Sequence, residues 1–278
     1  MASRCVAGYS PRRFADAWHN GGVDRRVTFR WAQWNPSADS VEMLSNSIGT
    51  FRHFFGDTPE YVVYADDPRF VAAHLRVDAA VRDMTVPGGE YLDPRATWMK
   101  WAPRFRHDSA AIEMRVDSDI FLVDEPVELR AFIAGDGHDY VVTMEEFTEL
   151  WVYGNFGPRL PPGFTPINAG FFGQRPAADL SEPMGAAYRW WTDHVRDDDV
   201  KYHDEQGALA FILQDLIANG RVLLLDPARY RVVCPLNDPP VEHLGGIVGL
   251  HATYPEHPAY HRFRAEISRI SGIPVRMP

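Results

Sequence analysis

The first half of the chain alternates between the two hydrophobic periodicities that distinguish strands from helices. Short runs rich in β-branched and aromatic residues are typical of buried strands. Apolar residues at positions 41, 44, 48, 51 and 55 have the spacing of one helix face, and Gly56 follows as a helix terminator. The predicted elements of this half are strands at residues 27–31, 60–65 and 109–116 and helices at residues 40–55 and 70–84.

The second half has a weaker pattern. Gly220 follows one predicted helix as its terminator, and a short apolar run comes directly after it. Periodicity fades beyond Asp226, and residues 267–278 have no pattern that favours an element. The predicted elements of this half are a surface loop rich in Gly and Pro at residues 154–166, helices at residues 184–195 and 205–219, and a strand at residues 222–225.

Strands that alternate with helices favour an α/β fold with a mostly parallel central sheet and helices on both faces. No shift in composition marks a domain boundary, so we predict one domain over residues 1–278. Ligands of such sheets bind beyond the carboxyl ends of the strands. Asp66 and the pair Asp117 and Asp119 each follow a predicted strand, so we expect them at that edge.

The aspartate pair is the strongest chemical signal in the chain. Asp117 and Asp119 flank Ser118 directly after an apolar strand. In an extended backbone, residues two apart point to the same side, so the two carboxylates would face one ligand. Mg²⁺ and Mn²⁺ prefer such oxygen ligands together with substrate phosphates. The alternative, a solvated acidic turn, is the more common explanation of an isolated pair of this kind.

Composition and charge narrow the class of protein. With 278 residues, 45% hydrophobic and 13% aromatic, the chain can bury a substantial core, which excludes disordered and fibrous classes. A net charge of -10 disfavours non-specific nucleic-acid binding. Cys5 and Cys234 are too few for a disulfide scaffold. The first 20 residues have no apolar signal-peptide core, and no run of 18 apolar residues is present, so we expect a cytoplasmic protein without a membrane span.

Further polar blocks accompany the aspartate pair. Lys100 and Arg104 suit the phosphates of a ligand. Trp98 and Trp101 beside them also fit a core, with the ammonium of Lys100 extending from it to solvent. The remaining blocks are Asn168, Ala169 and Gly170; Asp204, Glu205 and Gln206; and the late His251, with His257 and His261 as competitors.

Each of these blocks has a functional and a structural explanation. Small residues beside Asn168 let the backbone approach a ligand, and its amide can both donate to and accept from ligand hydroxyls, but a buried turn is the alternative. Asp204 and Glu205 open a predicted helix, where a carboxylate is stabilised by the helix dipole. Either is a candidate general base, and an N-cap is the alternative for Asp204. His251 suits a metal as a neutral imidazole.

The order of these blocks resembles that of the GT-A-fold glycosyltransferases, which use nucleotide-diphosphate sugars. The glycogenin-like branch has the most similar pattern: a strand, D-x-D, Asn-Ala/Ser-Gly, an acidic helix start with glutamine, and a late metal-binding histidine. The resemblance covers residues 27–261. The chain departs from it after His251, where the glycine and the Lys-Pro-Trp tail are missing.

The resemblance implies a single GT-A-like, Rossmann-type domain with an N-terminal extension (1–26), a nucleotide-binding half (27–119) and an acceptor-side half (120–265). It implies Mn²⁺ or Mg²⁺ on Asp117, Asp119 and His251, and catalytic roles for Asp204 or Glu205. Donor contacts are implied for Arg30, Trp31, Asp66, Lys100, Asp117, Ser118, Asn168, Ala169, Gly170 and Gln206.

We therefore expect a metal-dependent transferase that moves a sugar from a nucleotide-diphosphate donor to a hydroxyl group. The acceptor is a small molecule or a glycan, and the acidic charge disfavours a nucleic-acid acceptor. A nucleotidyltransferase is the first alternative, but the segment after the first strand has none of the glycines that such enzymes carry. A binding protein without catalysis is the second.

Overall fold

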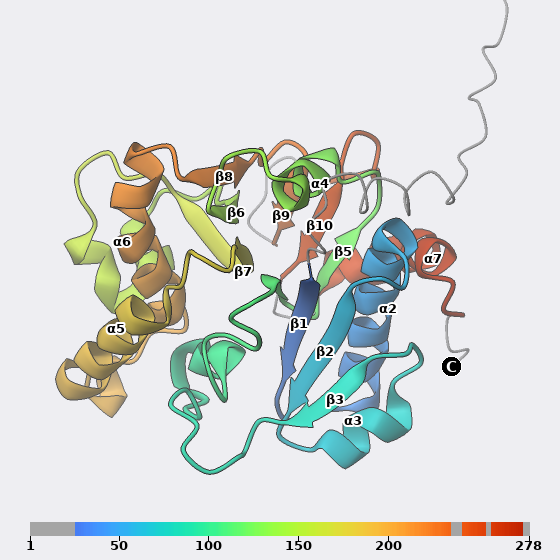
Figure 1. Cartoon of the computed structure of the whole chain (residues 1–278), viewed down its shortest axis with the longest axis horizontal. Helices are drawn as coiled ribbons and strands as arrows, with labels where there is room; N and C mark the ends of the chain where they lie inside the picture. The colour runs from blue at the N-terminus through green and yellow to red at the C-terminus, as the bar shows by residue number, and fades with distance from the viewer. Residues whose placement is uncertain (1–25, 235–240, 254–256, 275–278) are drawn as a thin grey trace, which may run out of the picture.

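The computed structural model describes residues 26–234, 241–253 and 257–274. Its main sheet has seven strands in the order β3-β2-β1-β4-β7-β6-β8, and a smaller sheet has the order β5-β10-β9 (Figure 1). The strands are β1 Val27–Gln33, β2 Glu60–Ala65, β3 Ala80–Asp83, β4 Ile112–Val116, β5 Ile120–Leu122, β6 Tyr140–Met144, β7 Ile167–Gln174, β8 Val222–Leu225, β9 Tyr230–Val233 and β10 Gly249–Ala252.

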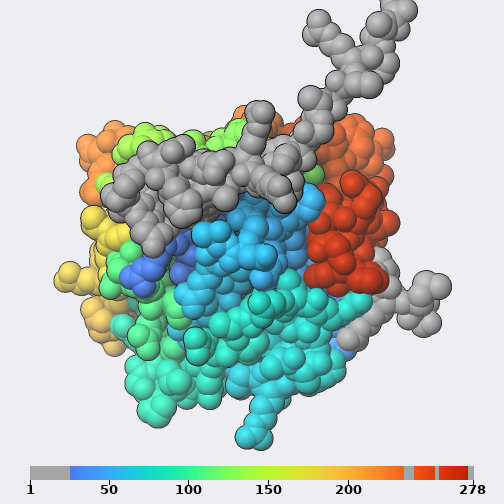
Figure 2. Space-filling model, turned by 45° about the vertical axis from the view of Figure 1, so that its right-hand side comes forward, coloured from blue at the N-terminus to red at the C-terminus, as the bar shows by residue number. Residues whose placement is uncertain are grey.

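The helices lie around the main sheet. α2 and α7 lie side by side, and α5 and α6 lie together beside β7 (Figure 1). The blue surface of α2 and the red surface of α7 adjoin in Figure 2. The α-helices are α2 Ala38–Phe55, α3 Pro68–His74, α4 Val127–Ala134, α5 Ser181–His194, α6 Asp204–Ala218 and α7 Pro258–Ser271, and the 3₁₀ segments are η1 Arg95–Trp101, η2 Leu150–Arg159 and η3 Asp197–Asp199. None of the helices in the described ranges has both the length and the apolar character needed to cross a membrane.

The predicted fold class is confirmed. β1 pairs in parallel with β2 and β4, β2 pairs in parallel with β3, and β6 pairs in parallel with β8. Only β7 runs antiparallel to its neighbours β4 and β6 in this sheet. The parallel strand β1 is buried on both faces, with Phe29 and Trp31 fully buried on one of them, as expected for a sheet covered by helices.

The predicted helix at residues 40–55 forms because both of its ends are specified locally. The Ser37 hydroxyl accepts from the Ser40 amide at 3.1 Å, and the Ser40 hydroxyl accepts from the Ser37 amide at 2.9 Å, which is a reciprocal capping box. Gly56 has a φ of 71°, which suits glycine, and its amide donates to the Arg52 carbonyl.

The predicted helix over residues 70–84 is correct only as far as His74. Helix α3 ends at His74, and residues 80–83 form β3 at the edge of the sheet. β3 pairs with β2, with Val81 opposite Val63. A strand of four residues has little periodicity of its own, so its pairing partner decides its conformation.

The prediction of a surface loop at residues 154–166 is correct only for its second part. The segment η2 runs to Arg159 and packs against α6. A Cβ on Gly207 would lie 1.9 Å from the Tyr153 carbonyl oxygen, so glycine is required for this close approach.

Three elements lie beyond Asp226, where the pattern of residues predicted none. β9 and β10 form the small sheet with β5, and α7 packs against α2. Helix α7 had a usable signal, since its buried side chains recur at helical spacing. These are Ala259, Tyr260, Phe263, Ile267 and Ile270.

Candidate metal and donor site

A cavity of about 900 Å³ opens at the carboxyl ends of β1, β4 and β6. β4 lies between β1 and β7, and the antiparallel β7 begins at this same edge. Segments far apart in the sequence therefore meet here. Gln33 ends β1, Asp117 and Asp119 follow β4, Glu145 follows β6, and Asn168 is the second residue of β7.

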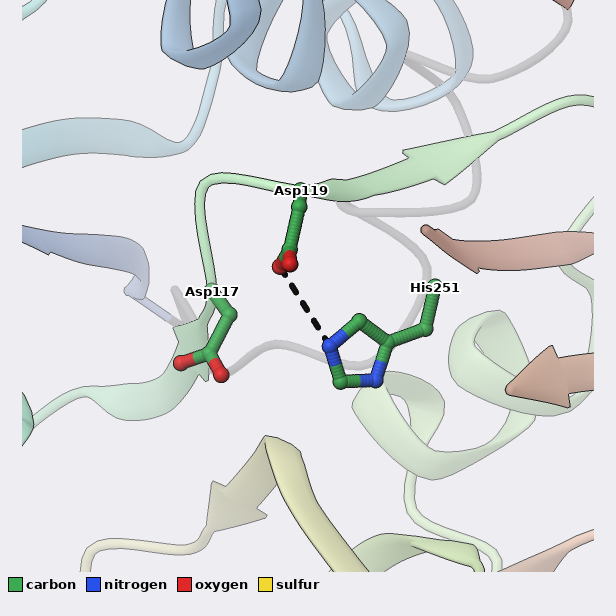
Figure 3. A group of neighbouring side chains, drawn as sticks. All are labelled: Asp117, Asp119 and His251. Atoms are coloured by element: carbon green, nitrogen blue, oxygen red, sulfur yellow. Dashed lines mark ion pairs between the residues drawn. The ribbon is translucent and has the colours of Figure 1, made fainter. Parts of the chain in front are cut away.

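Asp117, Asp119 and His251 converge in the cavity (Figure 3). One ligand atom from each lies within 4.8 Å of the others. His251 arrives there because β10 pairs antiparallel with β5, which sets His251 opposite Ile120. The Ala252 amide also donates to the Asp119 carbonyl oxygen at 2.9 Å. The small sheet thus brings a histidine from the end of the chain to the aspartate pair.

Two histidines flank Asp119. His251 Nε2 lies 3.3 Å from Oδ1, and His257 Nδ1 lies 3.3 Å from Oδ2. Burial raises the pKa of the Asp119 carboxyl, but the two histidines outweigh burial and hold this pKa below its usual range. Burial lowers the pKa of His257, and the hydrogen bond and charge of Asp119 raise it overall. Asp119 is therefore ionised, and His251 and His257 stabilise its negative charge.

Gly170 provides the space that His251 occupies. A Cβ at Gly170 would lie 2.4 Å from Cε1 of His251 and 2.9 Å from its Nδ1. The small residue predicted at this position is thus explained by contact with the imidazole.

We expect Gly170→Ala to weaken Mn²⁺ binding about 10- to 100-fold, because the added methyl group displaces the His251 ring from Asp119. Calorimetric titration with Mn²⁺ measures the effect. Gly245→Ala is the matched control, since its Cβ would meet nothing nearer than 3.3 Å. Equal Mn²⁺ affinity in the two variants would contradict the placement of His251.

Lys100 links the aspartate pair to helix α6. Its Nζ lies 2.7 Å from Oδ2 of Asp117 and 3.0 Å from Oε1 of Glu205. Burial lowers the pKa of Lys100, but these two carboxylates raise it above its usual value overall, so the ammonium stays charged. Arg115 Nη1 lies 3.1 Å from the other oxygen of Asp117, which leaves this carboxylate between two cations.

The amide side chains of the predicted donor site are held in fixed orientations. Asn168 donates to Glu145 at 2.8 Å and accepts from the Gly170 amide at 2.8 Å. Gln206 accepts from the Ala169 amide and donates to the Val152 carbonyl, each at 3.0 Å. Both residues line the cavity, as does Ser118, which donates to Gln33.

Asp204 and Glu205, the predicted catalytic carboxylates, are buried and are not among the residues that line the cavity. Asp204 accepts from the Trp191 indole at 2.8 Å and from the Lys201 and Asn155 amides. Glu205 accepts from Thr97 and Trp101 besides its contact with Lys100. Both carboxylates are therefore held by hydrogen bonds and an ion pair within the protein.

Arg30 and Trp31, predicted to contact the donor base, lie in the core, and neither lines the cavity. Arg30 pairs with Glu113 at 3.2 Å and donates to the Ala102 carbonyl at 2.7 Å. Trp31 donates to the Ser47 hydroxyl at 3.0 Å. Because β1 is buried on both faces, neither side of this strand can present a side chain to a ligand before its carboxyl end.

Asp66 and Arg104 also lie outside the lining of the cavity. The Asp66 carboxylate accepts from the Asn35 and Asp67 amides, which fixes the turn after β1 beside the turn after β2. Arg104 lines a separate polar cavity of about 380 Å³.

Several residues that line the cavity were not predicted from the sequence. Gln33 ends β1, Trp34 follows it, and Glu145 follows β6, so the strand ends were the signal that could have identified these residues. Aromatic residues at the other side of the cavity had no signal beyond their occurrence in polar segments. These are Phe147, Trp151, Tyr202 and His203.

Comparison with known proteins gives structural matches only. No protein-family model matches the chain, and no curated protein matches it in sequence. The galactosyltransferase LgtC, solved with donor and acceptor sugar analogs, superposes with a TM-score of 0.56 at 14% identity, covering 91% of this chain and 97% of LgtC. Glucosyl-3-phosphoglycerate synthase from Mycobacterium tuberculosis, solved with Mn²⁺, UDP-glucose and phosphoglyceric acid, superposes with a TM-score of 0.51 at 14% identity, covering 98% and 87%. The chain therefore has the GT-A-type fold of these transferases, as the order of its motifs implied.

Proposed function

We propose that this chain is a metal-dependent glycosyltransferase that uses a nucleotide-diphosphate sugar. The observation that carries the proposal is the convergence of Asp117, Asp119 and His251 in a large cavity at the carboxyl ends of the strands. The GT-A-type fold supports it, since LgtC is a galactosyltransferase by name and glucosyl-3-phosphoglycerate synthase was solved with Mn²⁺ and UDP-glucose. In this proposal we assign residues 27–119 to the nucleotide side of the site and the described residues of 120–265 to the acceptor side, apart from Asn168, Gln206 and His251, which we assign to the donor sugar and the metal.

The residues present fit a divalent metal ion. Two carboxylates and one imidazole are a donor set that suits Mn²⁺, and Mg²⁺ accepts the carboxylates. We assign Asp119 and His251 as ligands, with Asp117 as a ligand or a contact of the donor. A metal bound there neutralises the charge that develops on the diphosphate leaving group.

In the proposed reaction, the bond between the anomeric carbon and the diphosphate oxygen breaks, and the nucleoside diphosphate leaves with the bonding electrons. The acceptor oxygen bonds to the anomeric carbon, and its proton is released to solvent. Lys100 contributes a permanent positive charge beside Asp117, where it can contact a donor phosphate. Asn168 and Gln206 present fixed amides to the donor sugar.

Asp204 and Glu205 act in this proposal by holding other groups. Asp204 stabilises the approach of α6 to η2, through the Asn155 amide. Glu205 balances the charge of Lys100 from the side away from the cavity. The sequence predicted that Asp204 or Glu205 takes the proton of the acceptor hydroxyl as general base. This geometry disfavours that prediction, because neither carboxylate lines the cavity.

Turnover of a donor panel tests the proposal. The chain is incubated with UDP-, GDP-, TDP-, CDP- and ADP-sugars in Mn²⁺, and release of the nucleoside diphosphate is measured. We expect release from donors of one base, and its loss when EDTA is in excess. Pyrophosphate release from a nucleoside triphosphate and a sugar phosphate, without turnover of any nucleotide sugar, would replace the transferase with a nucleotidyltransferase.

A further inference from the structure

The side of the cavity formed by η2 and the start of α6 carries exposed aromatic rings. Trp151 and Tyr202 are each 55% exposed, although both line the cavity. The Trp151 ring lies 5.8 Å from the His203 ring, edge to face. Large apolar side chains left in contact with water at the mouth of a cavity mark a binding surface. We call Trp151, Tyr202 and His203 the aromatic rim.

The sheet order separates the aromatic rim from the nucleotide side. β1, which ends at Gln33, lies on one side of β4. β7, which contains Asn168, and β6, which η2 follows in the chain, lie on the other side of β4. Asp117 at the end of β4 is therefore between the two. A donor bound with its diphosphate at the aspartate pair and its base near β1 leaves the aromatic rim for the acceptor.

The charges around the cavity disfavour an acidic acceptor. Among the described residues that line it, Lys100 is the only lysine or arginine, and Asp117 and Glu205 already pair with its ammonium. Glu145 adds a further carboxylate on the acceptor side. Burial and the charge of Lys100 lower the pKa of His203, so its imidazole is neutral at pH 7. Lys100 and the proposed metal are assigned to the donor phosphates, so a phosphate or carboxylate at the aromatic rim would lose hydration without a lysine or arginine of this lining to pair with.

We propose that the acceptor is a neutral glycoside whose sugar ring stacks on Trp151. A sugar ring has an apolar face of C–H groups and a rim of hydroxyls, which matches an indole face beside polar side chains. The rim residues come from two segments that α6 and η2 hold together, because Gly207 allows their close approach. This inference rests on the proposed transferase function, since it assigns the acceptor side of the same cavity.

Binding measurements with defined sugars test the inference. Lactose, cellobiose and maltose are the neutral ligands, and 3-phosphoglycerate and glucose 6-phosphate are the acidic ones. Each is titrated by calorimetry and by saturation-transfer NMR, with and without Mn²⁺ and the nucleoside diphosphate. We expect a neutral disaccharide to bind and both acidic ligands to fail. We expect Trp151→Ala to weaken that binding about tenfold or more, and Trp151→Phe to restore part of it.

Leu150→Ala is the matched control. Leu150 is the neighbouring residue of η2, is 49% exposed and does not line the cavity, so its loss should leave sugar binding unchanged. Preferred binding of an acidic ligand, no binding of any neutral disaccharide, or equal affinity in Trp151→Ala and the unmodified chain overturns the inference. Nucleotide binding is measured in the same samples. Its absence, with neutral sugars still held through Trp151, would remove the transferase function and keep the sugar site.

Discussion

Asp119→Asn is expected to lower the rate of sugar transfer at least about a hundredfold and to leave the protein folded. The substitution removes a charge that His251 and His257 flank at 3.3 Å each, and it keeps the size of the side chain. Without that charge a metal would lose one of its proposed ligands, and the leaving diphosphate would lose the positive charge that such a metal supplies. The measurements are kcat/KM with the active donor and the Mn²⁺ affinity, with thermal unfolding as the check on folding.

Asp198→Asn is the control for the loss of one acidic charge, because Asp198 lies in the exposed segment η3. It should transfer sugar at the rate of the unmodified chain. Transfer by Asp119→Asn in excess EDTA at that same rate would contradict a metal role for Asp119.

Arg30→Met is expected to lower the free energy of unfolding by about 3–5 kcal/mol, a loss typical of breaking a buried ion pair. Arg30 is fully buried, and Glu113, its partner at 3.2 Å, is 2% exposed. The substitution leaves the Glu113 carboxylate without its cation, and it leaves the Ala102 carbonyl without its donor at 2.7 Å. Thermal and urea unfolding measure the loss, which corresponds to a fall in melting temperature of about 10 °C.

Arg82→Met is the matched control, since Arg82 is exposed on the edge strand β3 and its replacement should change stability by less than about 0.5 kcal/mol. The two variants also separate a structural role of Arg30 from the donor contact expected from the sequence. A folded Arg30→Met protein that retains its stability and loses nucleotide binding would contradict the structural role.

The sequence predicted those elements whose signals are local. Residues 40–55 have a helical stripe and are followed by the terminating Gly56, and the structure has a helix there. Residues 222–225 form the predicted strand. In contrast, β3 and the small sheet of β5, β10 and β9 depend on pairing partners distant in the chain, which a single sequence does not reveal.

The candidate site divides in the same way. Asp117, Asp119 and His251 were expected together from motif order, and they lie together. Arg30 and Trp31 were placed at a ligand because they end a strand, but the sheet buries both faces of β1, which residue types alone do not show. The aromatic rim was not predicted because Trp151 and Tyr202 come from irregular segments that only the packing of η2 on α6 brings together.

Thermal unfolding with UDP, GDP, TDP, CDP and ADP, each in Mn²⁺ or in EDTA, tests the central claim most directly. A ligand that binds the folded state at about 100 times its Kd adds about 2.7 kcal/mol of stability. For a chain of this size we expect a rise in melting temperature of about 5 °C or more with one nucleotide, in Mn²⁺ only. No rise with any nucleotide, or an equal rise in EDTA, would contradict a metal-dependent nucleotide site at Asp117, Asp119 and His251.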